Sequence, residues 1–124
     1  ALARFLESHD DVSEVRWLGL DSHPQRELAQ RQMTSSTGLL TFDLAGGLEA
    51  GRRFVEGVRI AQLATSLGGP ETLVTHPAST THVNLTPEEL AANGISPGTI
   101  RVSVGLEHAD DLVADFSQAL SIRA

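Results

Sequence analysis

The sequence contains no cysteine, no lysine and no tyrosine among its 124 residues. The absence of cysteine excludes disulfide bonds, thiolate nucleophiles and cysteine metal ligands, and it leaves the redox compartment undetermined. No stretch approaches the roughly 18 consecutive apolar residues that a transmembrane helix needs. The first residues, ALARFLESHDD, are charged and lack the apolar run of a signal peptide. These absences predict a cytoplasmic domain that makes no membrane contact.

Positive charge is also scarce. All nine basic side chains are arginines, sixteen residues are acidic, and the formal net charge is −7. Nucleic acids and anionic membranes attract basic surfaces, so this excess of negative charge argues against both as partners. The hydrophobic content of 40% and the charged content of 20% are typical of a globular protein, and the length corresponds to one domain.

Apolar periodicity and turn residues predict alternating helices and strands with no linker between them. Strands are expected over residues 12–19, 39–44 and 99–104, with short extended runs over 60–65 and 72–75. Helices are expected over residues 2–8, 24–33, 48–58 and 86–92, and from 110 toward the end of the chain. This order predicts an α+β fold, in which a small, mainly antiparallel sheet has helices packed on one face.

Apolar side chains on the predicted helices indicate which sides face the core. Leu28 and Ala29 are expected to point inward from the helix over 24–33. Leu48 is expected to share a buried stripe with Phe54 and Val55, because residues spaced by three or four lie on one side of a helix.

The segment Thr86-Pro87-Glu88-Glu89 has the form of a capping box with proline in the first turn, and Gly94 is placed to end the helix in the left-handed conformation. The cap explains the adjacent acids Glu88 and Glu89, so we do not interpret them as a catalytic carboxylate pair.

Two positions have side chains that suit ligand binding. Arg101 lies on the polar face of a strand whose other face carries Ile100 and Val102, and a planar guanidinium there suits bidentate recognition of a carboxylate. A surface arginine explains the same pattern. Ser66 precedes a glycine-containing loop that allows close approach of a bulky group, although an ordinary turn that contains a serine is the alternative.

Histidines provide no metal-binding pattern. His76 and His82 lie six residues apart, whereas two ligands on one helix face are spaced by four, and no cysteine or nearby carboxylate completes a site. Hydrogen-bonded structural histidines are therefore expected, and no metal site is predicted.

Several segments, taken in order, resemble the Cys/Met-metabolism family of pyridoxal-phosphate (PLP) enzymes. These segments are SHPQRELAQRQM (22–33), GGLEAGRRF (46–54), SLGG (66–69), ETLVTHPASTTH (71–82), TPEELAANGIS (86–96) and IRVSVGLEHADDL (100–112). The family includes methionine gamma-lyase, cystathionine gamma-synthase, cystathionine lyases and O-acylhomoserine sulfhydrylases. The resemblance covers nearly the whole chain, and several blocks in the right order are more specific than one short motif.

The resemblance implies that residues 1–124 are the C-terminal domain of a fold-type I PLP enzyme. In that family this domain contacts the substrate, while a preceding domain holds PLP through a Schiff-base lysine and a phosphate site. Arg101 is similar to the arginine that pairs with the substrate α-carboxylate. Ser66 is similar to the serine beside that carboxylate and the cofactor, with the Leu67 backbone nearby, and Thr81 to a threonine of the same pocket. No catalytic residue and no metal ligand is expected in this chain.

The missing lysine and tyrosine fit this interpretation, since the family places the Schiff-base lysine and the PLP-stacking tyrosine in the preceding domain. The isolated chain is therefore expected to bind no PLP and to have no activity. The implied partners are the preceding domain, the carboxylate of an amino-acid substrate and further copies of the enzyme in a dimer of dimers.

The implied reaction is gamma-elimination or gamma-replacement, with methionine gamma-lyase as the first choice and O-acylhomoserine sulfhydrylase or cystathionine gamma-synthase next. One alternative is a free-standing binding or regulatory domain that kept the fold, and another is one piece of a nicked enzyme. The presence of Arg101 and Ser66 favours the enzyme, because a binding module has no need of a carboxylate clamp.

Overall fold

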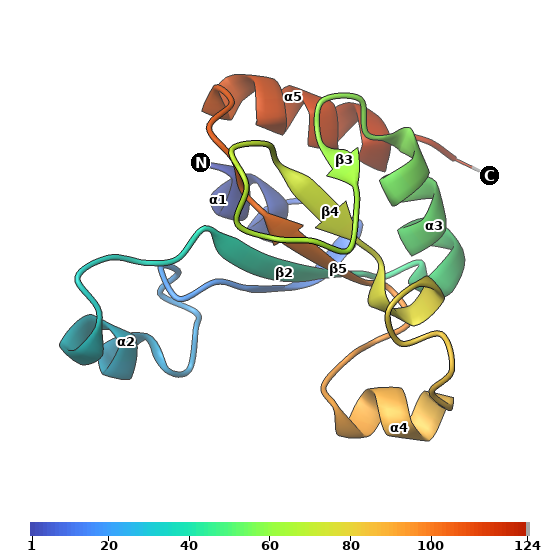
Figure 1. The fold of residues 1–124 in the computed structure, drawn as a ribbon, viewed down its shortest axis with the longest axis horizontal. Coiled ribbons are helices and arrows are strands. Elements are labelled where there is room, and N and C mark those ends of the chain that lie inside the picture. Colours follow the sequence, from blue (N-terminus) through green and yellow to red (C-terminus); the bar gives the residue numbers. More distant parts are fainter. Residues whose placement is uncertain (124) are drawn as a thin grey trace.

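Five strands form one sheet in the order β1-β2-β5-β4-β3 in the computed structural model, which describes residues 1–123 (Figure 1). The strands are β1 (Val12–Arg16), β2 (Leu39–Leu44), β3 (Gln62–Leu63), β4 (Leu73–Thr75) and β5 (Thr99–Ser103). Every pairing is antiparallel except that of β3 with β4, which is parallel. The prediction of a small, mainly antiparallel sheet is confirmed.

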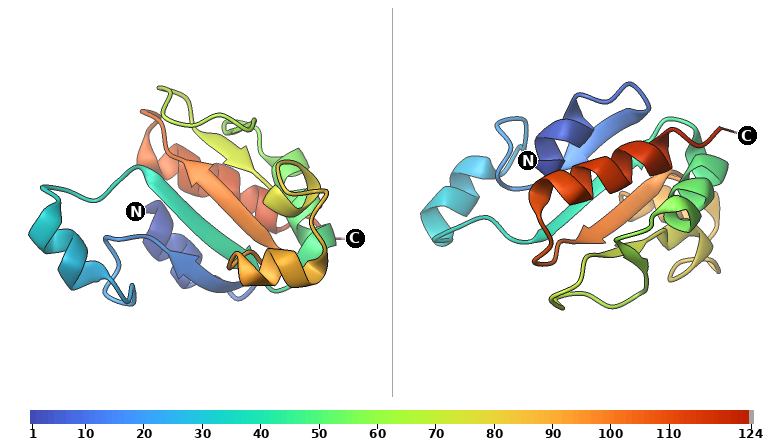
Figure 2. Two further views of the ribbon diagram at one scale, coloured as in Figure 1. Left: turned by 60° about the horizontal axis from the view of Figure 1, so that its bottom comes forward. Right: turned by 90° about the horizontal axis from the view of Figure 1, so that it is seen from above.

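Three helices cover one face of this sheet, and they are α1 (Leu2–Glu7), α3 (Gly47–Gly57) and α5 (Ala109–Leu120) (Figure 2). Two further helices, α2 (Arg26–Gln32) and α4 (Pro87–Ala92), lie away from them at opposite ends of the sheet (Figure 1). A short 3₁₀ helix, η1 (Pro77–Ser79), follows β4. Within residues 1–123, no helix is long and apolar enough to cross a membrane.

The hydrophobic core lies between the sheet and these three helices. Alternation along the strands turns Phe42 of β2 and Ile100 and Val102 of β5 toward the helices, where all three are fully buried. Phe42 packs edge to face on Phe54 of α3, with ring centroids 5.3 Å apart, and Phe54 packs similarly on Phe116 of α5 at 5.1 Å. Such aromatic pairs add about 0.5–1.5 kcal/mol each to the stabilisation from burial.

Three of the side chains predicted to face inward are not buried. Leu28 and Ala29 belong to α2, which has no buried residue, and Leu28 is 39% exposed. The connection between β1 and β2 carries α2 beyond the sheet, so its apolar side meets no layer of the described chain (Figure 1). Leu48 at the start of α3 is 37% exposed, whereas Phe54 and Val55 further along α3 are buried as predicted.

Helix α4 begins and ends as predicted. The hydroxyl of Thr86 accepts a hydrogen bond from the Glu89 N–H (3.3 Å), and the Glu89 carboxylate accepts one from the Thr86 N–H (2.8 Å), which completes the capping box. Gly94 follows the helix with φ of +69°, in the left-handed region that favours glycine.

The carboxylate of Asp115 in α5 anchors residues 59–61, which connect α3 to β3. It accepts hydrogen bonds from the backbone N–H groups of Arg59 (2.7 Å), Ile60 (3.0 Å) and Ala61 (3.0 Å), and Gln118 donates a fourth at 3.2 Å. Burial raises the pKa of Asp115, but these four hydrogen bonds lower it more, so the pKa lies below its ordinary value. Helix α5 thereby fixes the entry into β3.

Asp115→Asn is expected to lower the free energy of unfolding by about 1.5–3 kcal/mol at pH 7, because the amide loses the charge and turns a donor toward the backbone N–H groups. Because the pKa of Asp115 is lower in the folded state, its charge stabilises the folded protein at pH values above the unfolded pKa of about 3.9. This stabilisation is lost as the pH falls through the folded pKa. Urea unfolding at pH 7 and pH 3 should show that the difference between parent and variant narrows in acid.

The matched control for this experiment is Glu56→Gln, which changes an exposed acid in α3 in the same chemical way. This change should alter the free energy of unfolding by less than about 0.5 kcal/mol at either pH. Equal losses in the two variants, or a loss from Asp115→Asn that does not depend on pH, would contradict the role of the Asp115 charge.

Candidate functional site

The sheet face turned away from α1, α3 and α5 carries polar side chains. The strand register places four of them in one row, with Arg16 opposite Thr41, Thr41 opposite Arg101, and Arg101 opposite Thr75. Neighbouring strands lie about 4.8 Å apart, so side chains of adjacent members of this row are within contact distance. The row therefore brings together residues from β1, β2, β5 and β4.

Arg101 is held in this row by neutral acceptors. Its Nη2 donates to the carbonyl oxygens of Thr65 (2.8 Å) and Ser66 (3.2 Å) and to the hydroxyl of Thr75 (3.3 Å). Within residues 1–123, Arg101 forms no salt bridge with an aspartate or glutamate. Its positive charge is therefore positioned but not neutralised by the described part of the chain.

The hydrogen bonds of Arg101 also limit how it can hold a carboxylate. The two donor pairs that grip a carboxylate in the bidentate way are Nε with Nη2 and Nη1 with Nη2. All the hydrogen bonds that Arg101 makes within residues 1–123 start from Nη2. A bidentate carboxylate would take one of the two Nη2 hydrogens and leave the other to the protein acceptors.

Ser66, in the loop that follows β3, contacts Arg101 through its backbone and not through its side chain. The Ser66 carbonyl accepts from Arg101, and two residues later the N–H of Gly68 donates to the hydroxyl of Ser103 in β5 (2.8 Å). Gly68 has φ of +82°, which turns the chain at this point. The side chain of Leu67 is 53% exposed. The structure thus places this loop at the edge of the row.

Thr81 lies outside the contacts of Arg101. It follows η1, where its hydroxyl is 2.7 Å from Nδ1 of His82, and no hydrogen bond within residues 1–123 joins it to Arg101. The described chain therefore shows no hydrogen bond between Thr81 and Arg101, and the role of Thr81 stays a prediction.

His76 is fully buried, and its ring is hydrogen-bonded on both sides. Nε2 is 2.8 Å from the carbonyl oxygen of Pro97, which can only accept, so Nε2 carries a hydrogen. Nδ1 is 2.8 Å from the Ser79 hydroxyl, which donates to it when the ring is neutral. Both ring nitrogens are thus occupied, and the prediction of a structural histidine is confirmed for His76.

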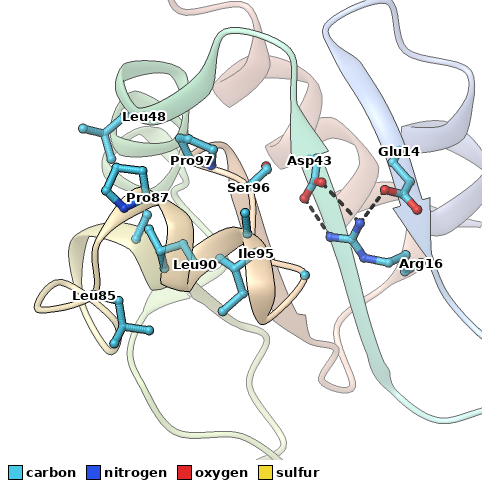
Figure 3. A pocket seen from close by; sticks show the side chains of 13 residues that line it. Glu14, Arg16, Asp43, Leu48, Leu85, Pro87, Leu90, Ile95, Ser96 and Pro97 are labelled. Carbon is cyan, nitrogen blue, oxygen red and sulfur yellow. Dashed lines mark hydrogen bonds and ion pairs between the residues drawn. The ribbon is translucent and has the colours of Figure 1, made fainter.

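An ion-pair group on the same face was not singled out by the sequence. Arg16 donates two hydrogen bonds to Asp43, at 2.8 and 3.2 Å, and a third to Glu14 (Figure 3). Asp43 also accepts from the hydroxyl of Thr99 (2.6 Å). Burial lowers the pKa of Arg16, but the contacts with Asp43 and Glu14 raise it more. Alternation along residues 39–44 puts Asp43 on the polar face, yet no local signal pairs it with Arg16.

The pocket shown in Figure 3 is open, has a volume of about 770 Å³, and separates this ion-pair group from α4. Its apolar wall is formed by Leu48, Leu85, Pro87, Leu90, Ile95 and Pro97. It accounts for the exposure of Leu48, which lines it instead of the core. None of Ser66, Leu67, Thr81 and Arg101 lines this pocket, so it is separate from the site that the sequence predicts.

Comparisons with known proteins agree on one family. The model of the family described as Cys/Met metabolism PLP-dependent enzyme matches residues 1–121. L-methionine gamma-lyase of Treponema denticola is 50% identical over 119 residues, which are 96% of this chain and 30% of that protein. O-succinylhomoserine sulfhydrylase of Pseudomonas aeruginosa is 44% identical over 121 residues, which are 98% of this chain and 30% of that protein.

A solved structure agrees with these sequence matches. The structure from Campylobacter jejuni, described as an O-acetylhomoserine (thiol)-lyase, contains N'-pyridoxyl-lysine-5'-monophosphate. It superposes with a TM-score of 0.90 at 40% identity, and the match covers 98% of this chain and 29% of that chain. The chain thus spans about three tenths of the length of the relatives that it matches.

The residues of this chain fit one part of a PLP site and not another. Covalent attachment of PLP needs a lysine amine, and none of the 124 residues is lysine. Arginine does not replace it, because the guanidinium stays protonated. The row around Arg101 fits a carboxylate instead. The chain therefore offers hydrogen-bond donors that suit a carboxylate, but it has no lysine to form a Schiff base with the cofactor.

Gly51→Ala tests the close packing that positions η1 beside this site. A Cβ at Gly51 would lie 2.3 Å from Nε2 of His76 and within 2.9 Å of two further ring atoms. Overpacking of this kind costs about 1–3 kcal/mol, which exceeds the gain of about 1 kcal/mol from replacing glycine by alanine in a helix. Urea unfolding should show a net loss of stability. Arg52→Ala, on the exposed side of the same helix, is the control, and equal or greater stability of Gly51→Ala would contradict the contact.

Proposed function

The chain belongs to the Cys/Met-metabolism family of PLP-dependent enzymes, and from this premise we propose that it is the C-terminal, substrate-side domain of a longer enzyme of sulfur amino-acid metabolism. The reaction is gamma-elimination or gamma-replacement on an amino acid. Methionine gamma-lyase is the first choice, because the lyase is the more similar of the two relatives described above. O-acylhomoserine sulfhydrylase and cystathionine gamma-synthase come next.

The observation that carries this proposal is the charge of Arg101. Its guanidinium is held by three neutral oxygens on the polar face of the sheet and forms no salt bridge within residues 1–123. In the proposed enzyme the substrate α-carboxylate completes this arrangement. A carboxylate provides the negative charge and the two coplanar acceptors that a guanidinium recognises best.

Holding the carboxylate also orients the reacting bonds. PLP, when bound, acts as an electron sink for carbanions formed next to the amino group. Arg101 fixes one substituent of the substrate Cα, so rotation about the bond between the amino nitrogen and Cα is restricted. With its carboxylate held in this way, the substrate would present one bond at Cα for reaction, and such orientation lowers the entropic part of the barrier.

Ser66, Leu67 and Thr81 are assigned supporting roles at the same carboxylate. The Ser66 hydroxyl is placed beside the carboxylate and the cofactor, and the Leu67 backbone lies next to it. The loop contact between Gly68 and Ser103 supports this arrangement because it holds the SLGG segment against β5. Thr81 is proposed as a member of the same pocket, on the resemblance of its segment to the family. The preceding domain and further copies of the enzyme, in a dimer of dimers, are the proposed partners.

The isolated chain is expected to retain no PLP and to have no activity, because it has no lysine to attach the cofactor. After incubation with PLP and removal of the free cofactor, its visible absorption spectrum should contain no band from bound PLP. The complete enzyme, meaning the polypeptide that joins this chain to a lysine-bearing PLP domain, should show that band after the same treatment. A stable band with the isolated chain would contradict the division of the site.

Arg101→Gln in the complete enzyme is expected to raise KM for the amino-acid substrate and to lower kcat/KM by about 10- to 150-fold, the loss that corresponds to charge-assisted hydrogen bonds of about 1.5–3 kcal/mol. Steady-state kinetics measure this loss. A substrate analogue with a carboxamide in place of the carboxylate should be used equally well by parent and variant. Arg52→Gln, an exposed arginine on α3, is the control and should leave KM unchanged. An unchanged KM for Arg101→Gln would refute the carboxylate assignment.

A further inference from the structure

We propose that Thr75 is a positioning residue for Arg101, which sets the guanidinium in place before the substrate arrives. This proposal rests on the assignment of Arg101 to the substrate carboxylate. Thr75 is the last residue of β4 and stands directly opposite Arg101 of β5 in the sheet register. Its side chain is almost fully buried, with 1% of the residue exposed. Nothing in the sequence pattern distinguished this threonine from an ordinary strand residue.

The direction of each hydrogen bond at Thr75 is set by chemistry. A hydroxyl has one hydrogen, and the Thr75 hydroxyl donates it to the carbonyl oxygen of Ala64. Arginine has no acceptor, so at the contact of 3.3 Å between Nη2 and Oγ1 it is Arg101 that donates. The Thr75 hydroxyl therefore donates to the backbone at Ala64 and accepts from the guanidinium of Arg101.

These two bonds tie Arg101 to the segment that follows β3. Ala64 is also bound to β4 through its N–H, which donates to the carbonyl of Val74 (3.1 Å). The carbonyl oxygen of the next residue, Thr65, accepts the shortest hydrogen bond of Arg101, at 2.8 Å. Thr75 thus acts on the guanidinium in two ways: it accepts a hydrogen bond directly, and it holds in place the backbone that accepts another.

Such positioning affects ligand binding because a free arginine side chain is flexible. An arginine carries about 2 kcal/mol of rotamer entropy, part of which is lost when it is fixed against a ligand. A side chain that is already fixed loses less on binding, so the ligand binds more tightly. Removal of the Thr75 hydroxyl should therefore weaken substrate binding even though Thr75 itself touches no substrate.

The alternative is that Thr75 only satisfies its own buried hydroxyl, and Thr72 is the residue that separates the two roles. Thr72 is also fully buried and precedes β4. Its hydroxyl donates to Glu107 (2.6 Å) and accepts from the N–H of Gly105 (2.9 Å), without contact to Arg101. Removing the Thr72 hydroxyl would break two buried hydrogen bonds in the same region. It would leave the contacts of the Arg101 guanidinium unchanged.

The experiment compares Thr75→Val, Thr75→Ser and Thr72→Val in the complete enzyme by steady-state kinetics and thermal unfolding. Thr75→Val should raise KM for the amino-acid substrate about 3- to 10-fold, as loss of one hydrogen bond implies, with a change of less than about twofold in kcat. Thr75→Ser keeps the hydroxyl and should restore KM to within about twofold of the parent. Thr72→Val should lower Tm and leave KM unchanged. If Thr75→Val does not fold, Thr75→Ala, which also lacks the hydroxyl, replaces it in every comparison.

A double variant distinguishes the two proposals. In an Arg101→Gln background, Thr75→Val should cause no further rise in KM, because there is no guanidinium left to position. An equal rise in both backgrounds, or an unchanged KM in the Arg101 enzyme, overturns the positioning role. If Arg101→Gln raises KM and Thr75→Val does not, the positioning role alone fails. If neither variant changes KM, the carboxylate assignment of Arg101 fails as well.

Discussion

The register of β5 is the constraint on which the rest of the site depends. Strand β5 pairs with β2 on one side and β4 on the other, and its alternation sends Ile100 and Val102 into the core and Arg101 to the opposite face. A slip of one residue would exchange the faces and put a guanidinium among the buried phenylalanines, which is prohibitively unfavourable. The packing of Phe42, Phe54 and Phe116 therefore fixes not only the core but also the side on which a ligand can meet Arg101.

Two arginines lie in the polar row, but only one of them is paired with carboxylates of the described chain. Arg16 is paired with Asp43 and Glu14, so its charge is neutralised by the chain itself, and it serves to join β1 to β2. Arg101, two strands away, is oriented by backbone carbonyls and a hydroxyl, which provide hydrogen-bond acceptors without a full negative charge. This difference separates an arginine that stabilises the sheet from one that suits an external carboxylate. It became visible only when the acceptors of each were known.

The sequence predicts those features whose residues lie close together along the chain, and it misses contacts between distant residues. The capping box at Thr86 and the alternation along β5 depend on residues within a few positions of one another, and both are present as predicted. The contact of Arg101 with Thr65 spans 36 residues, and the pair of Arg16 with Asp43 spans 27, so neither follows from a local pattern. Helix α2 shows the opposite failure. Its amphipathic pattern is real, but α2 contains no buried residue within the described chain, and Leu28 is exposed.

The position of Arg101 depends on contacts that extend as far as α5. Asp115 holds Arg59, Ile60 and Ala61 by their N–H groups, and the chain then enters β3 and passes to the carbonyl of Thr65. Because β3 is only two residues long, its own pairing with β4 cannot fix this segment firmly. Two contacts compensate for this weak pairing. Asp115 binds the residues before β3, and the Thr75 hydroxyl binds the carbonyl of Ala64, the residue after it. Arg101 is thus held by a segment that is hydrogen-bonded on both sides of β3, so its guanidinium is oriented by the described chain without being neutralised by it. The proposed role at a substrate carboxylate depends on this orientation.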